Sequence, residues 1–259
     1  LAPHPWKILK CAETGIVFLE NPPGYEALKE DFAWEKTYES EVNKRRADEP
    51  IRYKISSFLK DFRLKVLKRN KIKEIAKKEI LKIKESNSIE LLDVGCADGG
   101  ALEKIISELP QTYHSKCIPN GIEISAALAK IAREKAKRGK WIHNNAVDGM
   151  LEFDNDYFDI VILSSFLEHE IEPVQLLKNT LIKLKSHGSV IIKVPNFASW
   201  NRHIRKEKWC GFRHPDHVNY FTPDTLKETA LRSGFSKFSM KLLDKQPLSD
   251  SMYAVLKKS

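Results

Sequence analysis

Two acidic residues, each at the end of an apolar run, are placed where they could bind a ligand. Asp93 stands just before a glycine-rich turn at 95–100, and Glu123 ends a second apolar run thirty positions later. Glycines let a ligand approach the backbone closely. A carboxylate at this turn would repel a pyrophosphate but attract an amine-bearing cofactor, and the second carboxylate could hold a ribose. Without a ligand, Asp93 would be a cap and Glu123 an exposed strand end.

A second group of residues could transfer a proton. Glu168 and His169 follow the apolar run 158–164, and an aromatic segment further on contains His214 and His217. A histidine with a pKa of about 6.5 can accept a proton at neutral pH. His217 and His169 are therefore the first candidates for a general base or an orienting group, followed by His214, with Glu168 beside them. The alternative for each histidine is a structural role, with the ring bonded to backbone.

The elements that must position these residues begin at residue 89, where short apolar runs alternate with amphipathic stretches. Strands alternating with helices imply βαβ crossovers and a mostly parallel, doubly wound α/β sheet, with ligands beyond the carboxyl ends of its strands. We expect strands at 89–94, 117–123, 140–145, 158–164 and 188–194, and helices at about 99–109, 125–138, 172–184 and 223–233. The last two strands, near 236–243 and 251–257, would form an antiparallel hairpin at a sheet edge.

The first of these motifs resembles the class I S-adenosylmethionine-dependent methyltransferases. Asp93, Gly95 and Gly99 match the family pattern Asp-x-Gly-x-Gly-x-Gly, with Ala97 at the middle glycine. The resemblance implies a seven-stranded Rossmann-like sheet with an antiparallel edge strand, S-adenosylmethionine as cofactor and S-adenosylhomocysteine as product. It implies that Asp93 holds the amino group, Gly95 and Cys96 line the methionine, Glu123 binds both ribose hydroxyls, and Asn145 and Ala146 lie beside adenine, with Gly99, Ile124 and Ser164 also at the cofactor.

Two further runs resemble the small-molecule branch that includes ubiquinone-biosynthesis O-methyltransferases and sugar methyltransferases. They are Leu-Glu-His at 167–169, continued by Pro173, and Asp-His-Val-Asn-Tyr-Phe-Thr at 216–222. The resemblance implies methyl transfer to a small-molecule acceptor, with oxygen the first choice. Some members bind a metal through Glu-x-x-Glu-His, but here Ser165 replaces the first Glu, so we do not expect Mg²⁺. The Pro-Pro-aromatic motif that grips a flipped-out base does not follow the fourth strand.

The N-terminal residues resemble the end of a zinc-ribbon module. Cys11 is retained, but Thr14 replaces the second Cys and no Cys-x-x-Cys partner lies upstream, so we expect no zinc. We expect a remnant strand and turn packed on the main domain, with residues 25–38 over the substrate pocket. The predicted organisation is an accessory segment at 1–50, a basic helical region at 51–88, and the methyltransferase core at 89–259, with a substrate lid at about 196–222.

Positive charge is concentrated in one part of the chain. The 259 residues contain 44 Lys and Arg against 35 Asp and Glu, a net charge of +9, and segment 60–84 alone holds eleven basic residues and three acids. Apolar residues recur there at helical spacing, which predicts one or two amphipathic helices with a Lys-rich outer face, outside the catalytic core. This face is either a solvated surface or a platform for a phosphorylated substrate, an acidic membrane surface or RNA.

Two other functions therefore remain open. An RNA or protein methyltransferase could dock through the Lys-rich helices, although nucleic acid is not favoured. A non-catalytic cofactor-binding or scaffold protein would agree with Ala97, Ser165 and the lost zinc ligands. The four scattered cysteines favour a reducing compartment, so cytoplasm is the expected location, and the longest apolar stretch is too short to span a bilayer. Oligomeric state cannot be predicted from these patterns.

Overall fold

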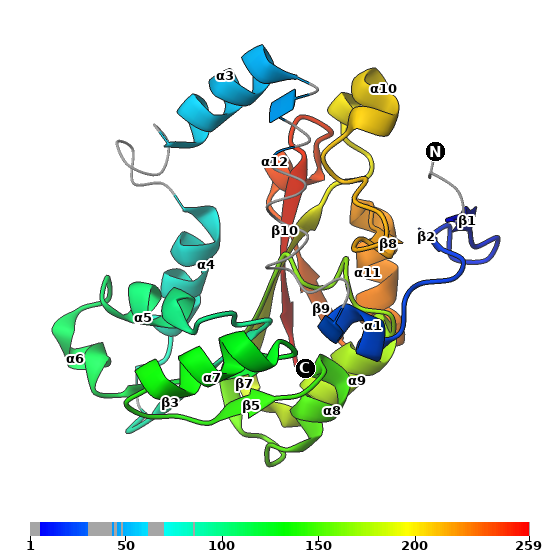
Figure 1. The fold of residues 1–259 in the computed structure, drawn as a ribbon. Coiled ribbons are helices and arrows are strands. Elements are labelled where there is room, and N and C mark those ends of the chain that lie inside the picture. The colour runs from blue at the N-terminus through cyan, green and yellow to red at the C-terminus, as the bar shows by residue number, and fades with distance from the viewer. Residues whose placement is uncertain are drawn as a thin grey trace.

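The computed structural model describes residues 6–30, 43, 46–47, 49–61, 70–84 and 86–258. Within them, seven strands form one twisted sheet in the order β5-β4-β3-β6-β7-β10-β9 (Figure 1). The first five strands of this order run parallel, and β10 is antiparallel to both β7 and the edge strand β9. The doubly wound α/β fold and the terminal antiparallel hairpin predicted from the sequence are therefore confirmed.

Most strands lie where the hydrophobic pattern predicts them. The bounds are β3 Ile89–Val94, β4 Cys117–Glu123, β5 Trp141–His143, β6 Phe158–Ser164, β7 Leu184–Pro195, β9 Lys237–Ser239 and β10 Ser251–Lys257. The third strand is shorter than expected because Asn145 caps helix α8 (Ala146–Leu151), which we did not predict. The fifth is longer because β7 begins directly at the end of α9 (Pro173–Lys183).

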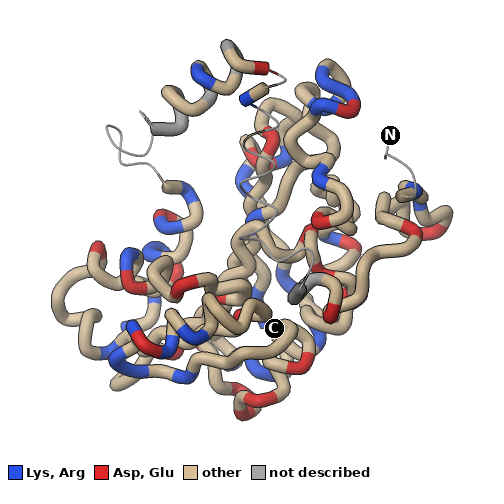
Figure 2. Tube along the Cα trace, viewed as in Figure 1, with Lys and Arg blue, Asp and Glu red and all other residues tan. Residues whose placement is uncertain are grey.

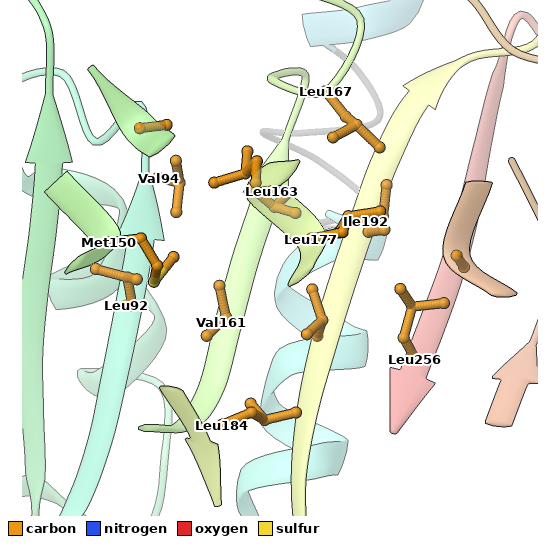
Figure 3. Close-up of a cluster of buried hydrophobic side chains, with 14 of the residues drawn as sticks. Leu92, Val94, Met150, Val161, Leu163, Leu167, Leu177, Leu184, Ile192 and Leu256 are labelled. Carbon is orange, nitrogen blue, oxygen red and sulfur yellow. The ribbon is translucent and has the colours of Figure 1, made fainter. Parts of the chain in front are cut away.

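The strands are buried on both faces, because successive side chains point into two different clusters. Leu92, Val94, Val161 and Leu163 pack on the α8 and α9 side, in the cluster drawn in Figure 3. Helix α11 (Pro223–Arg232) adds Leu226 and Ala230 to the same cluster. On the opposite face, Leu91, Ile160 and Ile162 pack with residues of α4 (Lys71–Ile80) and α5 (Gly100–Ile106).

Helix α4 belongs to this packed unit, although the sequence pattern placed it before the catalytic core. Its Ile75, Ala76 and Ile80 are buried against β6 and β7. The helix α3 (Pro50–Asp61) precedes it, and whether one helix or two cover the basic stretch lies outside the described residues. Helices α6 (Gln111–His114) and α7 (Ala126–Lys135) complete the connections between the parallel strands.

The N-terminal segment packs on the main domain, as predicted. Strands β1 (Ile8–Lys10) and β2 (Val17–Leu19) form a hairpin, and β2 also pairs with β8 (Asn219–Tyr220), giving a separate three-stranded sheet. Its apolar side chains join an aromatic cluster around Trp209 and Phe212. Helix α1 (Tyr25–Glu30) follows the hairpin. The expectation for residues beyond Glu30, up to Tyr38, falls outside the described residues.

The segment predicted as a lid contains the helix α10 (Trp200–Arg205), a short turn of 3₁₀ helix at Lys206–Lys208, and β8. The helix α12 (Leu242–Lys245) lies between β9 and β10. The Trp209 indole donates to Asp250 Oδ1 at 2.8 Å, so the lid is tied to the turn before β10. Among the residues that the structure describes, no helix combines the length and apolar character needed to cross a bilayer.

Candidate active site

A cavity of about 490 Å³ opens where β3, β4 and β6 end, at the edge of the sheet where such folds bind ligands. Its two ends have different linings. The first is built from strand ends and the turns after them: Gly95, Ala97, Glu123, Ile124, Asn144, Ala146 and Ser164. The second carries aromatic and ionisable groups from separate segments: Tyr25, Phe166, His169, Glu170, Arg213 and Asp216. We call these the strand end and the lid end of the cavity.

Glu123 is the most firmly oriented polar side chain at the strand end. Its Oε2 accepts from the backbone N–H of Ala97 at 2.8 Å, and its Oε1 accepts from that of Ser125 at 2.9 Å. The side chain lies at the end of β4 and is only 8% exposed. Each carboxylate oxygen still has acceptor capacity, so Glu123 can receive two hydroxyl groups of a bound ribose.

Two glycines of the turn are required because aromatic rings pack closely against them and their backbone is left-handed. Gly95 has φ +72°, and a methyl group placed on it would lie 2.5 Å from the Phe166 ring. Gly99, the N-cap of α5 with φ +76°, would bring a methyl group to 2.7 Å from the Trp141 ring. Ala97, at the family's middle glycine, also has a positive φ of 47°. A left-handed alanine costs about 1–2 kcal/mol, which explains the usual glycine at this position.

Asp93 occupies a depression on the other side of the turn. Burial, followed by the charge of nearby Glu123, raises the pKa of Asp93 to about 8. A cation placed there would relieve the repulsion between the two carboxylates. Cys96 and Ser164 share this depression with Ile72 and Lys73 at the start of α4. The basic region therefore reaches the glycine turn, which corrects our view that it lies outside the catalytic core.

The turn after β5 uses its two asparagines differently. The Asn145 Oδ1 accepts from the Asp148 backbone N–H at 2.9 Å, and its Nδ2 donates to the Asp148 carboxylate at 2.7 Å. Asn145 therefore caps α8. The cavity wall at this point is formed by Asn144 and Ala146. Asn144 was not among our sequence candidates, although it lies next to one of them.

His169 is the histidine that lines the cavity. Its Nδ1 lies 2.8 Å from the Asp216 carbonyl oxygen, which can only accept, so Nδ1 carries the proton and Nε2 has the lone pair. Burial and then the Arg213 charge lower the pKa of His169 to about 4. The ring is therefore neutral at pH 7, with one nitrogen able to accept a hydrogen bond.

Tyr25 and Glu170 close the lid end. The Tyr25 hydroxyl donates to Glu170 Oε1 at 2.5 Å, and Glu170 is 2% exposed. Burial raises the pKa of Glu170. Arg213 donates to Asp216 at 3.0 Å and places a cation on the same wall. Sequence reasoning missed Glu170 and Arg213, although each directly adjoins a candidate, His169 or His214.

Two other candidates lie against His169 without appearing in the cavity wall. The His217 ring meets that of His169 edge to face, with ring centroids 4.6 Å apart, and its Nδ1 lies 2.8 Å from the Gly211 carbonyl oxygen. Glu168 is 1% exposed, and burial raises its pKa to about 7. Both remain candidates for proton transfer through His169.

His214 lies in the aromatic cluster of the lid. Its ring stacks with Phe212 at a centroid distance of 6.0 Å, and its Nδ1 lies 3.3 Å from the Tyr220 hydroxyl. It does not appear in the cavity wall. The structure thus brings His169, His217 and Glu168 together at the lid end and gives His214 packing contacts within the lid.

Glu168, His169 and His217 could also hold a metal ion, since their ligand atoms all lie within 4.8 Å of one another. The Mg²⁺ site of some relatives needs a third residue at the position of Ser165. Here the Ser165 hydroxyl accepts from Lys193 Nζ at 2.9 Å, which puts a cation at that position. Two nitrogens and one carboxylate are not the oxygen set that Mg²⁺ prefers, so these residues do not fit it.

The sheet order, the glycine turn after the first parallel strand and the acid that ends the second define the class I S-adenosylmethionine-dependent methyltransferases. Sequence comparison agrees with this classification. A family model described as a methyltransferase domain matches residues 52–239, and the chain belongs to this family. The match includes α4, in agreement with its packing against the sheet.

Individual proteins are similar to this chain at low sequence identity. The mitochondrial ubiquinone biosynthesis O-methyltransferase of Candida albicans is 29% identical over 140 residues, which cover 51% of this chain and 41% of that protein. An S-adenosylmethionine-dependent methyltransferase structure from Archaeoglobus fulgidus is 19% identical, with a TM-score of 0.50 over 78% of this chain and 99% of its own. The CurJ carbon methyltransferase is 20% identical, with a TM-score of 0.54 over 72% of this chain and 54% of its own. These two structures show the fold alone.

Proposed function

We propose that the protein transfers the methyl group of S-adenosylmethionine to an oxygen of a small-molecule acceptor. One observation carries the proposal: a single cavity is lined both by Glu123, which can receive ribose hydroxyls, and by His169, whose Nε2 has a lone pair. A volume of about 490 Å³ suits a cofactor and a small acceptor better than a macromolecule. The O-methyltransferase named among the relatives supports oxygen as the acceptor atom.

The residues at the strand end fit the cofactor. Glu123 would bind the ribose hydroxyls, and Asn144 and Ala146 would flank the adenine. Asp93, on the other side of the glycine turn, would attract the amino group of the cofactor. When bound, S-adenosylmethionine supplies a methyl group that its sulfonium already activates. The protein therefore contributes mainly position, by holding the acceptor oxygen in line with that methyl group.

The lid end would bind and deprotonate the acceptor. Phe166 offers an apolar surface, while Arg213 and the Tyr25–Glu170 pair offer polar contacts. His169 Nε2 would accept the hydroxyl proton as the new carbon–oxygen bond forms. Because the pKa of His169 is lowered to about 4, the proton would pass on to a better acceptor, and Glu168, with a pKa raised to about 7 and a ligand atom within 4.8 Å, is the candidate.

The test is a direct assay of cofactor binding and turnover. Calorimetry should detect S-adenosylmethionine binding, and a panel of catechols, hydroquinones and sugars should yield S-adenosylhomocysteine together with an O-methylated product identified by mass spectrometry. Absence of cofactor binding would reject the methyltransferase proposal. Binding without product on any acceptor would instead favour a non-catalytic role.

We further propose that transfer requires neither zinc nor Mg²⁺. Lys193 beside Ser165 opposes Mg²⁺, and Thr14 leaves the N-terminal segment without its second cysteine ligand. Dialysis against EDTA should leave turnover unchanged. A loss that Mg²⁺ or Zn²⁺ restores would contradict this and would make Glu168, His169 and His217 the first candidates for its ligands.

A further inference from the structure

One end of the molecule gathers large apolar side chains that are open to solvent. On α10, Trp200 is 59% and Ile204 77% exposed; on α12, Leu242 is 73% and Leu243 72% exposed, and Leu248 in the next turn is 68% exposed. We call these five residues the apolar tip. The two segments are neighbours, because the Trp200 backbone N–H donates to the Pro247 carbonyl at 2.8 Å. Figure 1 shows both helices at the same end of the molecule.

Helix α3 adds apolar side chains to this end of the molecule. Its Ile55 is 56% and its Phe58 68% exposed, and an ion pair between Glu49 and Arg205 joins the start of α3 to α10. The other exposed large apolar residues of the described chain are dispersed over several elements, and only Leu151 among them is more than half exposed. Single exposed apolar residues are ordinary, but a contiguous group of them marks an interaction surface.

Lysines surround the apolar tip. Lys206 and Lys208 follow α10, and Lys241 and Lys245 flank α12; all four are exposed and none has an ion-pair partner among the described residues. The one acid of α12, Asp244, is buried and paired with Lys71. In Figure 2 both blue and red segments lie at this end of the molecule. The exposed Glu207 lies between two of these lysines, so the surface is apolar with an excess of positive charge.

Helix α4, part of the basic stretch 60–84 that the sequence indicated as a platform, lacks this character, while residues 62–69 of that stretch lie outside the described residues. Lys73 and Lys77 pair with Glu108 at 2.6 and 3.2 Å, and Lys71 pairs with Asp244. Much of its positive charge is thus matched within the chain, and its apolar side chains face the sheet. A docking surface for an anionic partner is better sought at the tip.

We propose that the apolar tip docks on the surface of an anionic membrane. Trp200, Ile204 and the α12 leucines would enter the headgroup boundary, while the surrounding lysines would contact lipid phosphates. A tryptophan among leucines and lysines suits this boundary, where aromatic rings and flexible cations are favoured. Protein interfaces are instead depleted in lysine, which argues against a protein partner.

Vesicle flotation tests the proposal. The full chain should float with vesicles of equal parts phosphatidylglycerol and phosphatidylcholine, and less with phosphatidylcholine alone. Replacing Ile204 and Leu243 with Ser should weaken binding at least about tenfold. A second variant, with Gln in place of Lys206, Lys208, Lys241 and Lys245, should lose the preference for anionic vesicles. The matched control replaces Leu151 and Ile182 with Ser, since these apolar side chains lie elsewhere and are 57% and 49% exposed. This variant should bind vesicles as the unchanged protein does.

A second readout follows the tip itself. Brominated lipids should quench the fluorescence of Trp200, and Trp200→Phe should remove that part of the quenching. Unchanged S-adenosylmethionine affinity would show that each variant is folded, and neither measurement depends on turnover. Equal flotation of tip and control variants, or no binding to anionic vesicles, would overturn the proposal. So would a lipid-free dimer that the Ser variant dissociates, because a second copy would then be the partner.

Discussion

The two ends of the cavity differ in how far apart their residues lie along the chain. The strand end comes from the ends of β3, β4, β5 and β6 and the turns after them, so each of its residues lies at or just after a strand end. The lid end collects Tyr25, the turn after β6 and the segment around Arg213, which lie far apart in the chain. Its geometry depends on β2 pairing with β8 and on the packing of the aromatic cluster.

This difference predicts a division of labour. Backbone turns fix the strand end, so changes there should alter cofactor binding. Side chains from distant segments form the lid end, so changes there should alter acceptor binding and turnover while leaving cofactor affinity intact. Substitutions at each end test whether the two ends are independent.

The largest effect is expected for Glu123→Ala. Two hydrogen bonds to a carboxylate would be lost, each worth about 1.5–3 kcal/mol, so S-adenosylmethionine affinity should fall roughly a thousandfold in calorimetry. The thermal midpoint must be measured as well, because the Ala97 and Ser125 amides lose their acceptor. Tyr25→Phe, at the other end, is the control and should bind the cofactor normally.

His169→Ala should separate binding from catalysis. Loss of a positioned proton acceptor typically costs a factor of about 100 or more, so turnover should fall about a hundredfold with S-adenosylmethionine affinity unchanged. His214→Gln, in the aromatic cluster, is the matched imidazole control and should largely retain turnover. If both variants lose cofactor affinity, the lid end is not independent of the strand end.

A smaller effect is expected for Tyr25→Phe. The change removes the hydroxyl that donates to Glu170 but leaves that carboxylate its bond from the Glu172 amide at 2.9 Å. In the proposed function the Tyr25 hydroxyl is also a polar contact for the acceptor, and losing one hydrogen bond of about 1 kcal/mol corresponds to a KM for the acceptor about fivefold higher. Steady-state kinetics at saturating cofactor would measure it, and an unchanged KM would place the acceptor away from Tyr25.

The smallest effect has the opposite sign. Ala97→Gly relieves a left-handed alanine but increases the freedom of the unfolded chain, so the free energy of unfolding should rise by up to about 1 kcal/mol. Ala127→Gly, within α7, should lower it by a similar amount. Urea unfolding would compare the two, and equal losses would show that residue 97 is not strained.

The sequence predicted the strand end better than the lid end, because the strand end is built from local segments and the lid end from distant ones. Glu123 and the glycine turn are local patterns, so their residues could be read directly from strand ends. Arg213 and Glu170 become neighbours only through the fold of the lid, which periodicity does not encode. Helix α8 was missed because its start was read as a continuing strand, although Asn145 three residues before Asp148 is a capping pattern.

The carboxyl of Asp93 adds a thermodynamic consequence to the site. With its pKa raised to about 8, it is largely protonated at pH 7 in the free protein. An ammonium group bound nearby would favour the ionised form, so binding would expel a proton into the buffer. Affinity should then rise with pH up to about 8, by at most about tenfold per unit. The heat of binding at pH 7 should vary with the ionisation enthalpy of the buffer, and Asp93→Asn should abolish that variation.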